Sequence, residues 1–166
     1  MPVRGHGPVT KRQFGAWIMN KNSEVLEILK QVNQFADLSD STLEAIAGIT
    51  VQRNYEEGDS IYSLGEDASD IFVVMSGRIR FSLGADNRAG ISGSIITVGQ
   101  MFGWAALIGE NSRRVATALC LENSSLLVVD GGKLLEIFDL DSDAGYLFMR
   151  GLASMIANNF MDVLSN

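Results

Sequence analysis

The 166-residue sequence contains one cysteine, one histidine, two prolines and no apolar run of the roughly 20 residues that a membrane-spanning helix needs. The single cysteine, Cys120, excludes an intrachain disulfide, and its apolar surroundings indicate a small buried side chain. A chain without disulfides suits a reducing compartment, so we expect a cytoplasmic protein. No apolar segment at the N-terminus resembles a signal peptide, and no membrane contact is expected.

The scarcity of histidine and cysteine also bears on catalysis. His6 is the only histidine and lies in a glycine-rich stretch, and the sequence shows no cluster with metal-ligand spacing. The carboxylates fall in turn and loop patterns rather than beside a nucleophile or a second acid. The sequence therefore predicts a protein that is not an enzyme and holds no metal and no cofactor.

Acidic residues are absent from the first 22 positions, which carry four basic residues. Of the 13 basic residues nine remain for the rest of the chain, against all 20 acidic ones, which gives that part a net charge of −11. A body this acidic repels phosphate backbones, so we expect no direct nucleic-acid binding. We interpret residues 1–22 as a flexible N-terminal arm, with contact to an acidic partner as the alternative, and residues 23–166 as one domain.

Helical patterns come first along the chain. Ser23 is a suitable N-cap for a helix that we expect to end near Phe35, with a short helical piece at Phe14–Met19 before it. Apolar residues recur at three- and four-residue spacing in this helix: Val25, Leu26, Leu29 and Val32. Asp40 or Ser41 is expected to cap a second short helix. Together the two helices predict a hairpin that packs on a larger unit.

Strand patterns fill the stretch from Ile49 to Asp130, where runs of β-branched and aromatic residues alternate with glycine turns. The continuous apolar run Ile71–Met75 indicates a strand buried on both faces. After a turn at Ser76-Gly77, residues 78–83 alternate, so that the inward positions are expected to be Ile79, Phe81 and Leu83. Further strands are expected at 95–98, 114–121 and 126–129, with a polar loop at 84–93. Many short strands predict a β-sandwich, jelly roll or barrel.

The C-terminal part is helical. A short helix is expected from Gly131, and Asp141 or Ser142 is expected to cap a long one that runs to about Leu164. The apolar positions of the long helix cover more than one stripe: Phe148, Met149, Leu152, Met155, Ile156, Phe160, Val163 and Leu164. One stripe can pack on the β-unit. The other predicts either a partly exposed helix or a homodimer formed through it.

Residues 99–118 hold a pattern typical of an anion cradle. The run Gly103–Leu107 combines small side chains with the start of a short helical turn, where unpaired N–H groups converge. Arg114 adds a guanidinium that is always charged and can bind an anion in a bidentate way. If a strand alternates from Arg114, then Ala116 and Ala118 share its face and leave a hollow beside it. In the alternative, an acid such as Glu110 pairs with Arg114, which then only fastens the loop, and Arg113 is a solvated neighbour.

The chain resembles the cyclic nucleotide-binding domain superfamily, which includes catabolite-activator-type regulators and cyclic nucleotide-dependent kinases. The helix and strand order matches over about residues 23–165, and so do the turn motifs Glu57-Gly58-Asp59, Gly65-Glu66 and Val74-Met75-Ser76-Gly77. The phosphate-binding cassette of the family is matched by Phe102-Gly103-Trp104-Ala105-Ala106-Leu107 and Arg114-Val115-Ala116-Thr117. The resemblance implies a mainly β fold: an eight-stranded jelly-roll β-barrel with an N-terminal helix hairpin and a C-terminal lid helix.

The resemblance also implies a function: a stand-alone, bacterial-type regulatory sensor domain in signal transduction that binds a cyclic nucleotide or a related phosphorylated ligand. Cyclic AMP and cyclic GMP are the candidate ligands. The implied ligand-binding residues are Phe102, Gly103, Trp104, Ala105, Ala106, Arg114, Val115 and Ala116. Relatives that read DNA carry a helix-turn-helix after the lid helix, whereas this sequence ends at Asn166, so DNA binding of that kind is not expected.

Trp104 departs from the family pattern. Family members usually have glutamate at this position, which accepts a hydrogen bond from the ribose 2′-hydroxyl, whereas tryptophan has only an N–H donor. Losing a charged hydrogen bond lowers affinity by about ten- to hundredfold. Trp104 and the apolar terminal helix therefore support an alternative function, a degenerate domain without ligand that acts as a protein-interaction or dimerisation module.

Overall fold

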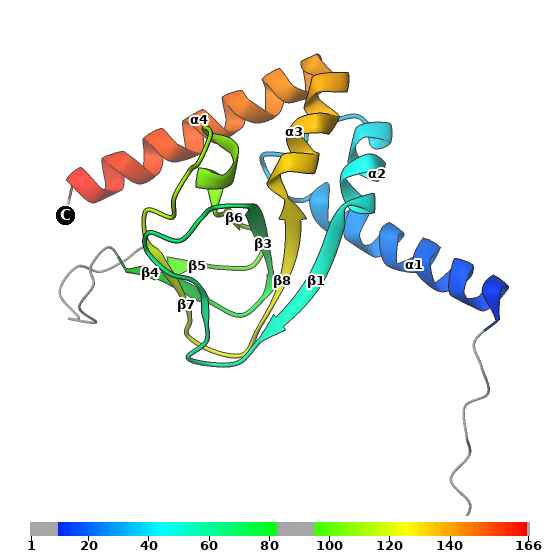
Figure 1. Ribbon diagram of the computed structural model, residues 1–166, viewed down its shortest axis with the longest axis horizontal. Coiled ribbons are helices and arrows are strands. Elements are labelled where there is room, and N and C mark those ends of the chain that lie inside the picture. The colour runs from blue at the N-terminus through cyan, green and yellow to red at the C-terminus, as the bar shows by residue number, and fades with distance from the viewer. Residues whose placement is uncertain (1–9, 83–94, 166) are drawn as a thin grey trace, which may run out of the picture.

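The computed structural model describes residues 10–82 and 95–165. Helices are found at α1 (Lys11–Leu29), α2 (Asp40–Gly48), α3 (Gly131–Leu140) and α4 (Ser142–Leu164), with a 3₁₀ turn η1 (Trp104–Leu107). Strands in the described ranges are β1 (Thr50–Tyr55), β2 (Ser60–Tyr62), β3 (Asp70–Ser76), β4 (Ile79–Ser82), β5 (Ile95–Ile96), β6 (Met101–Phe102), β7 (Thr117–Cys120) and β8 (Ser124–Asp130). Figure 1 shows α4 running above the strands, with its C-terminal end at the left, and α1 extending to the right of them.

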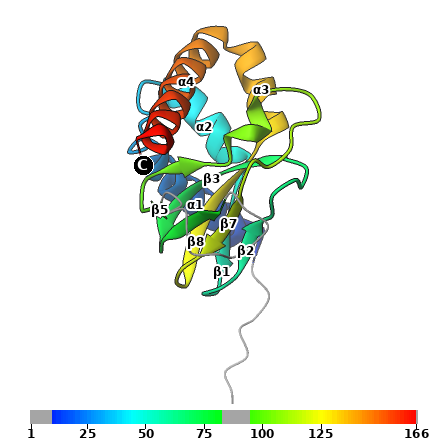
Figure 2. The same ribbon diagram turned by 90° about the vertical axis from the view of Figure 1, so that its left-hand side faces the viewer.

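The strands form two four-stranded antiparallel sheets, ordered β1-β8-β3-β6 and β2-β7-β4-β5. Within the described residues the hydrogen-bonded ladders join the strands into these two sheets rather than into one closed ring. Figure 2 shows α2, α3 and α4 gathered over one side of the strands. The predicted fold class, a mainly β jelly roll with N-terminal helices and a C-terminal helix, is confirmed.

β3 separates two hydrophobic cores. Ile71 and Val73 face the helices, where they join a cluster with α2, α3 and α4. Phe72 and Val74 face the interior between the sheets, where aromatic residues collect. All four side chains are buried, as the continuous apolar run predicts. The alternation of β3 therefore connects the helical layer to the interior of the sandwich.

The first helix begins earlier than predicted. Thr10 caps α1 in a capping box with Gln13, so the predicted start at Ser23 is wrong. Ser23 lies inside the helix and donates its hydroxyl to the carbonyl of Met19 at 2.9 Å. Residues 1–9 of the predicted flexible arm lie outside the described residues, and the boundary between arm and domain stays a prediction.

The helix junctions are held by caps. Ser39, one residue before the two predicted candidates, caps α2 and accepts from the Thr42 N–H. Asp141 caps α4 as predicted, accepting from the Ala144 N–H at 3.2 Å. The Thr42 hydroxyl also donates to Asp141 at 2.6 Å, which ties α2 to the corner between α3 and α4. The hydrogen bond from the Thr42 hydroxyl lowers the pKa of Asp141 most, and the hydrogen bond from the Ala144 N–H lowers it further.

Two strands are shorter than predicted. β5 covers only Ile95–Ile96, and β7 begins at Thr117 rather than Arg114. Leu83 and the predicted loop at 84–93 lie outside the described residues. In the described part of the chain no helix is both long enough and apolar enough to cross a bilayer, and the cytoplasmic location stays a prediction.

Candidate anion-binding site at Arg114

The turn after β6 is built around Gly103. Its φ is +86°, a left-handed conformation that side chains rarely adopt. A Cβ atom at this position would lie 2.9 Å from Phe72 Cδ2 and 3.1 Å from Arg114 Nη1. Glycine is therefore needed both for the turn and for the close approach of the arginine.

The helical turn predicted from Gly103 to Leu107 is present as η1, a single 3₁₀ turn that begins at Trp104. One such turn is too short to sum peptide dipoles as a longer helix does. The Gly103 carbonyl accepts from the Ala106 N–H at 3.3 Å and from Arg114 Nη1 at 2.9 Å. Arg114, rather than the helix start, is therefore the main positive group of the cassette.

η1 also contacts the helical layer. Ala105 is buried and Ala106 is half-buried. A Cβ at Gly131, the first residue of α3, would lie 3.2 Å from Ala106 Cβ and 2.8 Å from the Ser69 carbonyl. α3 therefore starts directly against η1, and small residues on both sides allow this contact.

The backbone of Arg114 is fixed by the turn at Gly65-Glu66. Its N–H donates to the Glu66 carbonyl at 2.8 Å, and its carbonyl accepts from the Gly65 N–H at 2.9 Å. Side chains alternate as predicted, because Arg114 and Ala116 are 4% and 6% exposed whereas Val115 is 53% exposed. The arginine points into the molecule although the strand itself begins only at Thr117.

The guanidinium of Arg114 is held by backbone carbonyls. Nη1 donates to Gly103 at 2.9 Å and Nη2 donates to Asp70 at 2.8 Å. Nε is buried and has no hydrogen-bond partner among the described residues. Arg114 forms no ion pair with a carboxylate of those residues, and Glu110, the predicted alternative partner, is exposed. The site thus buries a cation whose charge is not neutralised and whose hydrogen bonding is incomplete.

Aromatic rings complete the surroundings of the guanidinium. Its central carbon lies 4.2 Å from the ring centroid of Tyr62 and 5.5 Å from that of Phe72. Burial lowers the pKa of Arg114, while the charges of Tyr62, Asp70 and Glu66 act in the opposite direction. An arginine nevertheless stays protonated in proteins. Burial raises the pKa of Tyr62 to about 12, and the Arg114 charge opposes this rise.

The predicted site residues fall into two groups. Phe102, Gly103 and Arg114 meet at the aromatic side of the cassette, where Phe102 stacks on Phe72 with centroids 5.1 Å apart. Trp104 is partly buried and packs against the hydrophobic cluster of the helical layer. The ligand-binding role of the eight predicted residues stays a prediction.

Sequence reasoning missed three groups at this site: the Tyr62 ring, the Phe72 ring and the carbonyl of Asp70. Tyr62 reaches Arg114 because β2 pairs with β7, with Tyr62 opposite Ala118. A local sequence pattern cannot predict the pairing of two strands that lie more than 50 residues apart. Arg113, predicted to be solvated, is exposed and pairs with Asp67 at 3.2 Å.

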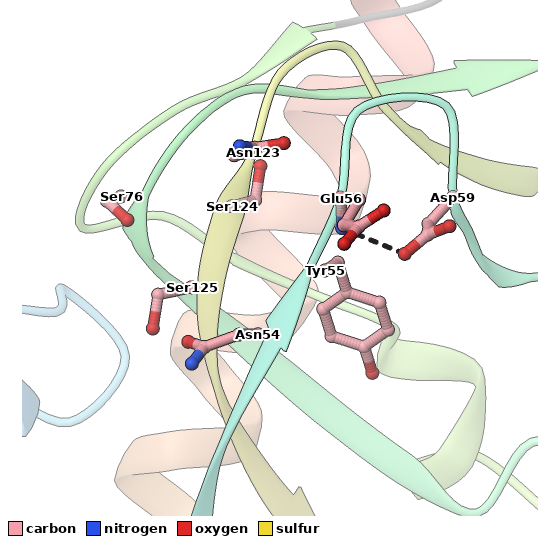
Figure 3. A pocket seen from close by; sticks show the side chains of 8 residues that line it. All are labelled: Asn54, Tyr55, Glu56, Asp59, Ser76, Asn123, Ser124 and Ser125. Atoms are coloured by element: carbon pink, nitrogen blue, oxygen red, sulfur yellow. Dashed lines mark hydrogen bonds between the residues drawn. The ribbon is translucent and has the colours of Figure 1, made fainter.

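An open depression lies elsewhere on the molecule and differs in chemistry (Figure 3). It has a volume of about 560 Å³ and is lined by Asn54, Tyr55, Glu56, Asp59, Ser76, Asn123, Ser124 and Ser125. The Glu56 N–H donates to an Asp59 carboxylate oxygen at 2.8 Å. Its lining holds two carboxylates and no cationic side chain, so it is unsuited to a phosphate.

Comparison with known proteins shows to which family the chain is similar. The family model described as "Cyclic nucleotide-binding domain" matches residues 52–141, more than half of the chain. A cGMP-dependent protein kinase, egl-4 of Caenorhabditis briggsae, is 25% identical over 126 residues, which are 75% of this chain and 17% of the kinase. A cGMP-dependent protein kinase of Drosophila melanogaster, isozyme 2 forms cD5/T2, is 28% identical over 113 residues, 66% of this chain and 12% of the kinase. The chain thus spans less than a fifth of these relatives.

Solved structures show the same fold. A putative cyclic nucleotide-binding protein from Geobacter metallireducens superposes with a TM-score of 0.70 at 19% identity, covering 81% of this chain and 96% of that one. The regulatory domain of Toxoplasma gondii PKA, crystallised with cAMP, superposes with a TM-score of 0.62 at 21% identity, covering 71% of this chain and 44% of that one. Both likenesses concern the arrangement of the backbone.

Proposed function

Because the chain belongs to the cyclic nucleotide-binding domain family, we propose that it is a regulatory sensor domain that binds the phosphate of a cyclic nucleotide at Arg114. The observation that carries the proposal is the buried guanidinium, whose Nε is unpaired and which has no carboxylate partner among residues 10–82 and 95–165. A bound monoanion would supply both the missing acceptor and the missing negative charge. Arginine suits this role because its donors match a phosphate in a bidentate geometry.

A purely structural role accounts for only part of this arrangement. Fastening η1 to β3 needs the two bonds from Nη1 and Nη2 to carbonyl oxygens, and both are present. It does not need a full positive charge in a buried position, which costs free energy when no anion compensates it. Cyclic GMP and cyclic AMP are the ligands that we propose, since relatives are named for the first and a structural neighbour was crystallised with the second.

Ligand binding would be coupled to the helices through η1. Nε is buried in this structure. A phosphate would reach it when the hydrogen bond from Arg114 Nη1 to the Gly103 carbonyl opens and η1 moves away from Arg114. η1 packs on Gly131, the first residue of α3, and α3 leads directly into α4. A ligand that favours the separated arrangement therefore shifts the population of α3 and α4 positions, and α4 acts as the lid that reports binding.

Trp104 sets the expected strength of binding. Its indole N–H has no acceptor capacity, so it offers nothing to a ribose hydroxyl that donates a hydrogen bond. We expect affinity about ten- to hundredfold below that of a domain with a carboxylate at this position. The phosphate contact at Arg114 then contributes a larger share of the binding free energy.

Thermal unfolding with and without nucleotide tests the proposal. Cyclic AMP or cyclic GMP at about 100 times its dissociation constant adds about 2.7 kcal/mol of stability, which raises Tm by roughly 5–10 °C for a domain of this size. Arg114→Ala should remove the shift, and Arg113→Ala, a matched change at the exposed neighbour, should keep it. Absence of a shift with both nucleotides at millimolar concentration would overturn the proposal.

Exposed apolar residues on α4 support a second candidate, a dimerisation module. Phe160 and Leu164 are 61% and 64% exposed. They continue a stripe of exposed positions with the four-and-three spacing of a coiled coil: Tyr146, Arg150, Ala153, Ala157, Phe160 and Leu164. Sedimentation equilibrium should show a dimer that Phe160→Glu dissociates and Asn158→Glu, off the stripe, leaves intact. A monomer at all concentrations would exclude this module.

A further inference from the structure

We propose that Tyr62 is the positioning residue of the Arg114 site: its ring, in place of a carboxylate, seats the guanidinium and leaves the positive charge free for an anionic ligand. The inference deepens the proposed function and rests on it for its ligand. It concerns a residue that the cassette motif does not contain, since Tyr62 belongs to β2 and lies about 50 residues before Arg114.

The ring is placed rigidly under the guanidinium. The ladder between β2 and β7 sets Tyr62 opposite Ala118, four residues after Arg114. The ring also contacts Phe72 and Phe102, with centroids 5.8 Å and 6.2 Å away. Tyr62 is 9% exposed, and the central carbon of the guanidinium lies 4.2 Å from its centroid. This distance is well within the range of a cation–π contact.

The neighbouring carboxylates form no ion pair with Arg114 in the described part of the chain, although the charges of Asp70 and Glu66 oppose the lowering of its pKa by burial. Asp70 contributes its backbone carbonyl to Arg114, while its carboxylate accepts from the Ser69 hydroxyl at 3.1 Å. Asp67 pairs with Arg113. A carboxylate beside the guanidinium would neutralise it and compete with a phosphate, whereas the face of an aromatic ring stabilises a cation without occupying its N–H donors. The arrangement holds a cation in the interior without a carboxylate partner among the described residues, so that its Nε–H can bind a phosphate once the hydrogen bond from Nη1 opens.

The hydroxyl is not what positions the guanidinium. Tyr62 Oη forms no hydrogen bond with the described residues, and the contact to Arg114 is through the ring face. Tyr62→Phe keeps the ring and should therefore behave like the wild type. Tyr62→Leu removes the ring. The guanidinium of Arg114 then loses its cation–π contact, although both of its carbonyl partners remain.

Calorimetric titration of the full 166-residue chain with cyclic GMP, cyclic AMP and inorganic phosphate tests the inference. Tyr62→Leu should weaken binding of the ligands that bind the wild type by about two- to thirtyfold, and Tyr62→Phe by less than about twofold. Phe81→Leu is the matched control, because Phe81 belongs to the same aromatic cluster, 5.7 Å from the Phe102 centroid, without contacting Arg114. It should bind like the wild type. Equal affinity of wild type and Tyr62→Leu would overturn the inference.

A second measurement needs no ligand and separates the two proposals. The Nε–Hε resonance of Arg114 in a ¹⁵N-labelled sample should carry the ring-current shift of Tyr62, which Tyr62→Leu removes and the Tyr62→Phe and Phe81→Leu variants keep. If no nucleotide or phosphate binds the wild type, the proposed function fails, and this resonance still decides whether Tyr62 seats the guanidinium. A resonance unchanged in Tyr62→Leu would show that it does not.

Discussion

The two ends of β8 carry two different kinds of candidate site. Ser124 and Ser125, at its start, line the open depression of Figure 3. Asp130, at its end, pairs with Asp70, whose carbonyl binds Arg114. Seven residues of strand separate the two ends by about 20 Å. One end is open, polar and acidic, and the other is closed and buries a cation.

From this difference we propose that unmet hydrogen bonding marks the anion site of this molecule better than open volume does. The depression has ample space, yet its charged side chains are the carboxylates of Glu56 and Asp59. The Arg114 end offers a buried donor, Nε, for which the described residues provide no acceptor. Buried polar groups are almost always paired, so this exception is the observation on which the proposed anion site rests.

Arg114→Ala should have the largest effect. It removes a buried cation and two hydrogen bonds, which leaves the Asp70 carbonyl without the arginine donor and the Gly103 carbonyl with the Ala106 N–H alone, at a cost of about 2–5 kcal/mol of stability. Nucleotide affinity should fall by about 100-fold or more. Urea unfolding and calorimetric titration below the lowered Tm measure the two effects separately. Wild-type affinity in this variant would place the phosphate elsewhere.

A pair of glycine substitutions compares the two ends directly. Gly103 and Gly77 both have left-handed backbones, and a Cβ would collide at both, with Phe72 Cδ2 at 2.9 Å and with Ser124 Cα at 2.8 Å. Each change to alanine should cost about 1–3 kcal/mol, measured by urea unfolding. Only Gly103→Ala should also weaken nucleotide binding, because its Cβ presses on Arg114. Equal losses of affinity would remove the distinction between the ends.

The helix junction at Asp141, one helix beyond the end of β8, should respond to acid. Since the pKa of Asp141 is lowered in the folded state, its ionised form stabilises the fold above its unfolded pKa, near 3.9, and this contribution is lost as pH falls through the folded pKa. Asp141→Asn should be less stable than wild type at pH 7, and the difference should shrink below about pH 4. The exposed Asp139→Asn serves as control. A difference that does not depend on pH would contradict the role of the charge.

The smallest effect is expected at the depression. Glu56→Gln removes one of its two carboxylates and should leave affinity for cyclic GMP within about twofold, since the charge lies far from Arg114 and is screened at physiological salt. Calorimetric titration of this variant with cyclic GMP at 0.15 M salt measures the affinity. Affinity that rises tenfold would mean that the phosphate binds in the depression.

Local patterns predicted much of this molecule. The apolar run at Ile71–Met75 identified the strand buried on both faces, and the alternation from Arg114 to Ala116 predicted which side chains point inward. The early start of α1 also has a local sequence signal, the capping box of Thr10 and Gln13. The contacts that position Arg114 could not be predicted from local sequence, because they depend on the pairing of β2 with β7 and on a carbonyl of β3.

We propose that Arg114 Nε, which has no hydrogen-bond partner in the described part of the chain, receives the phosphate of a cyclic nucleotide. Titration of the ¹⁵N-labelled chain with cyclic GMP and cyclic AMP, followed at the Arg114 Nε–Hε resonance, tests it most directly. This resonance should move downfield as a hydrogen bond forms, and the change should saturate with the calorimetric dissociation constant. Binding that leaves the resonance unchanged, or no binding of either nucleotide, would contradict it.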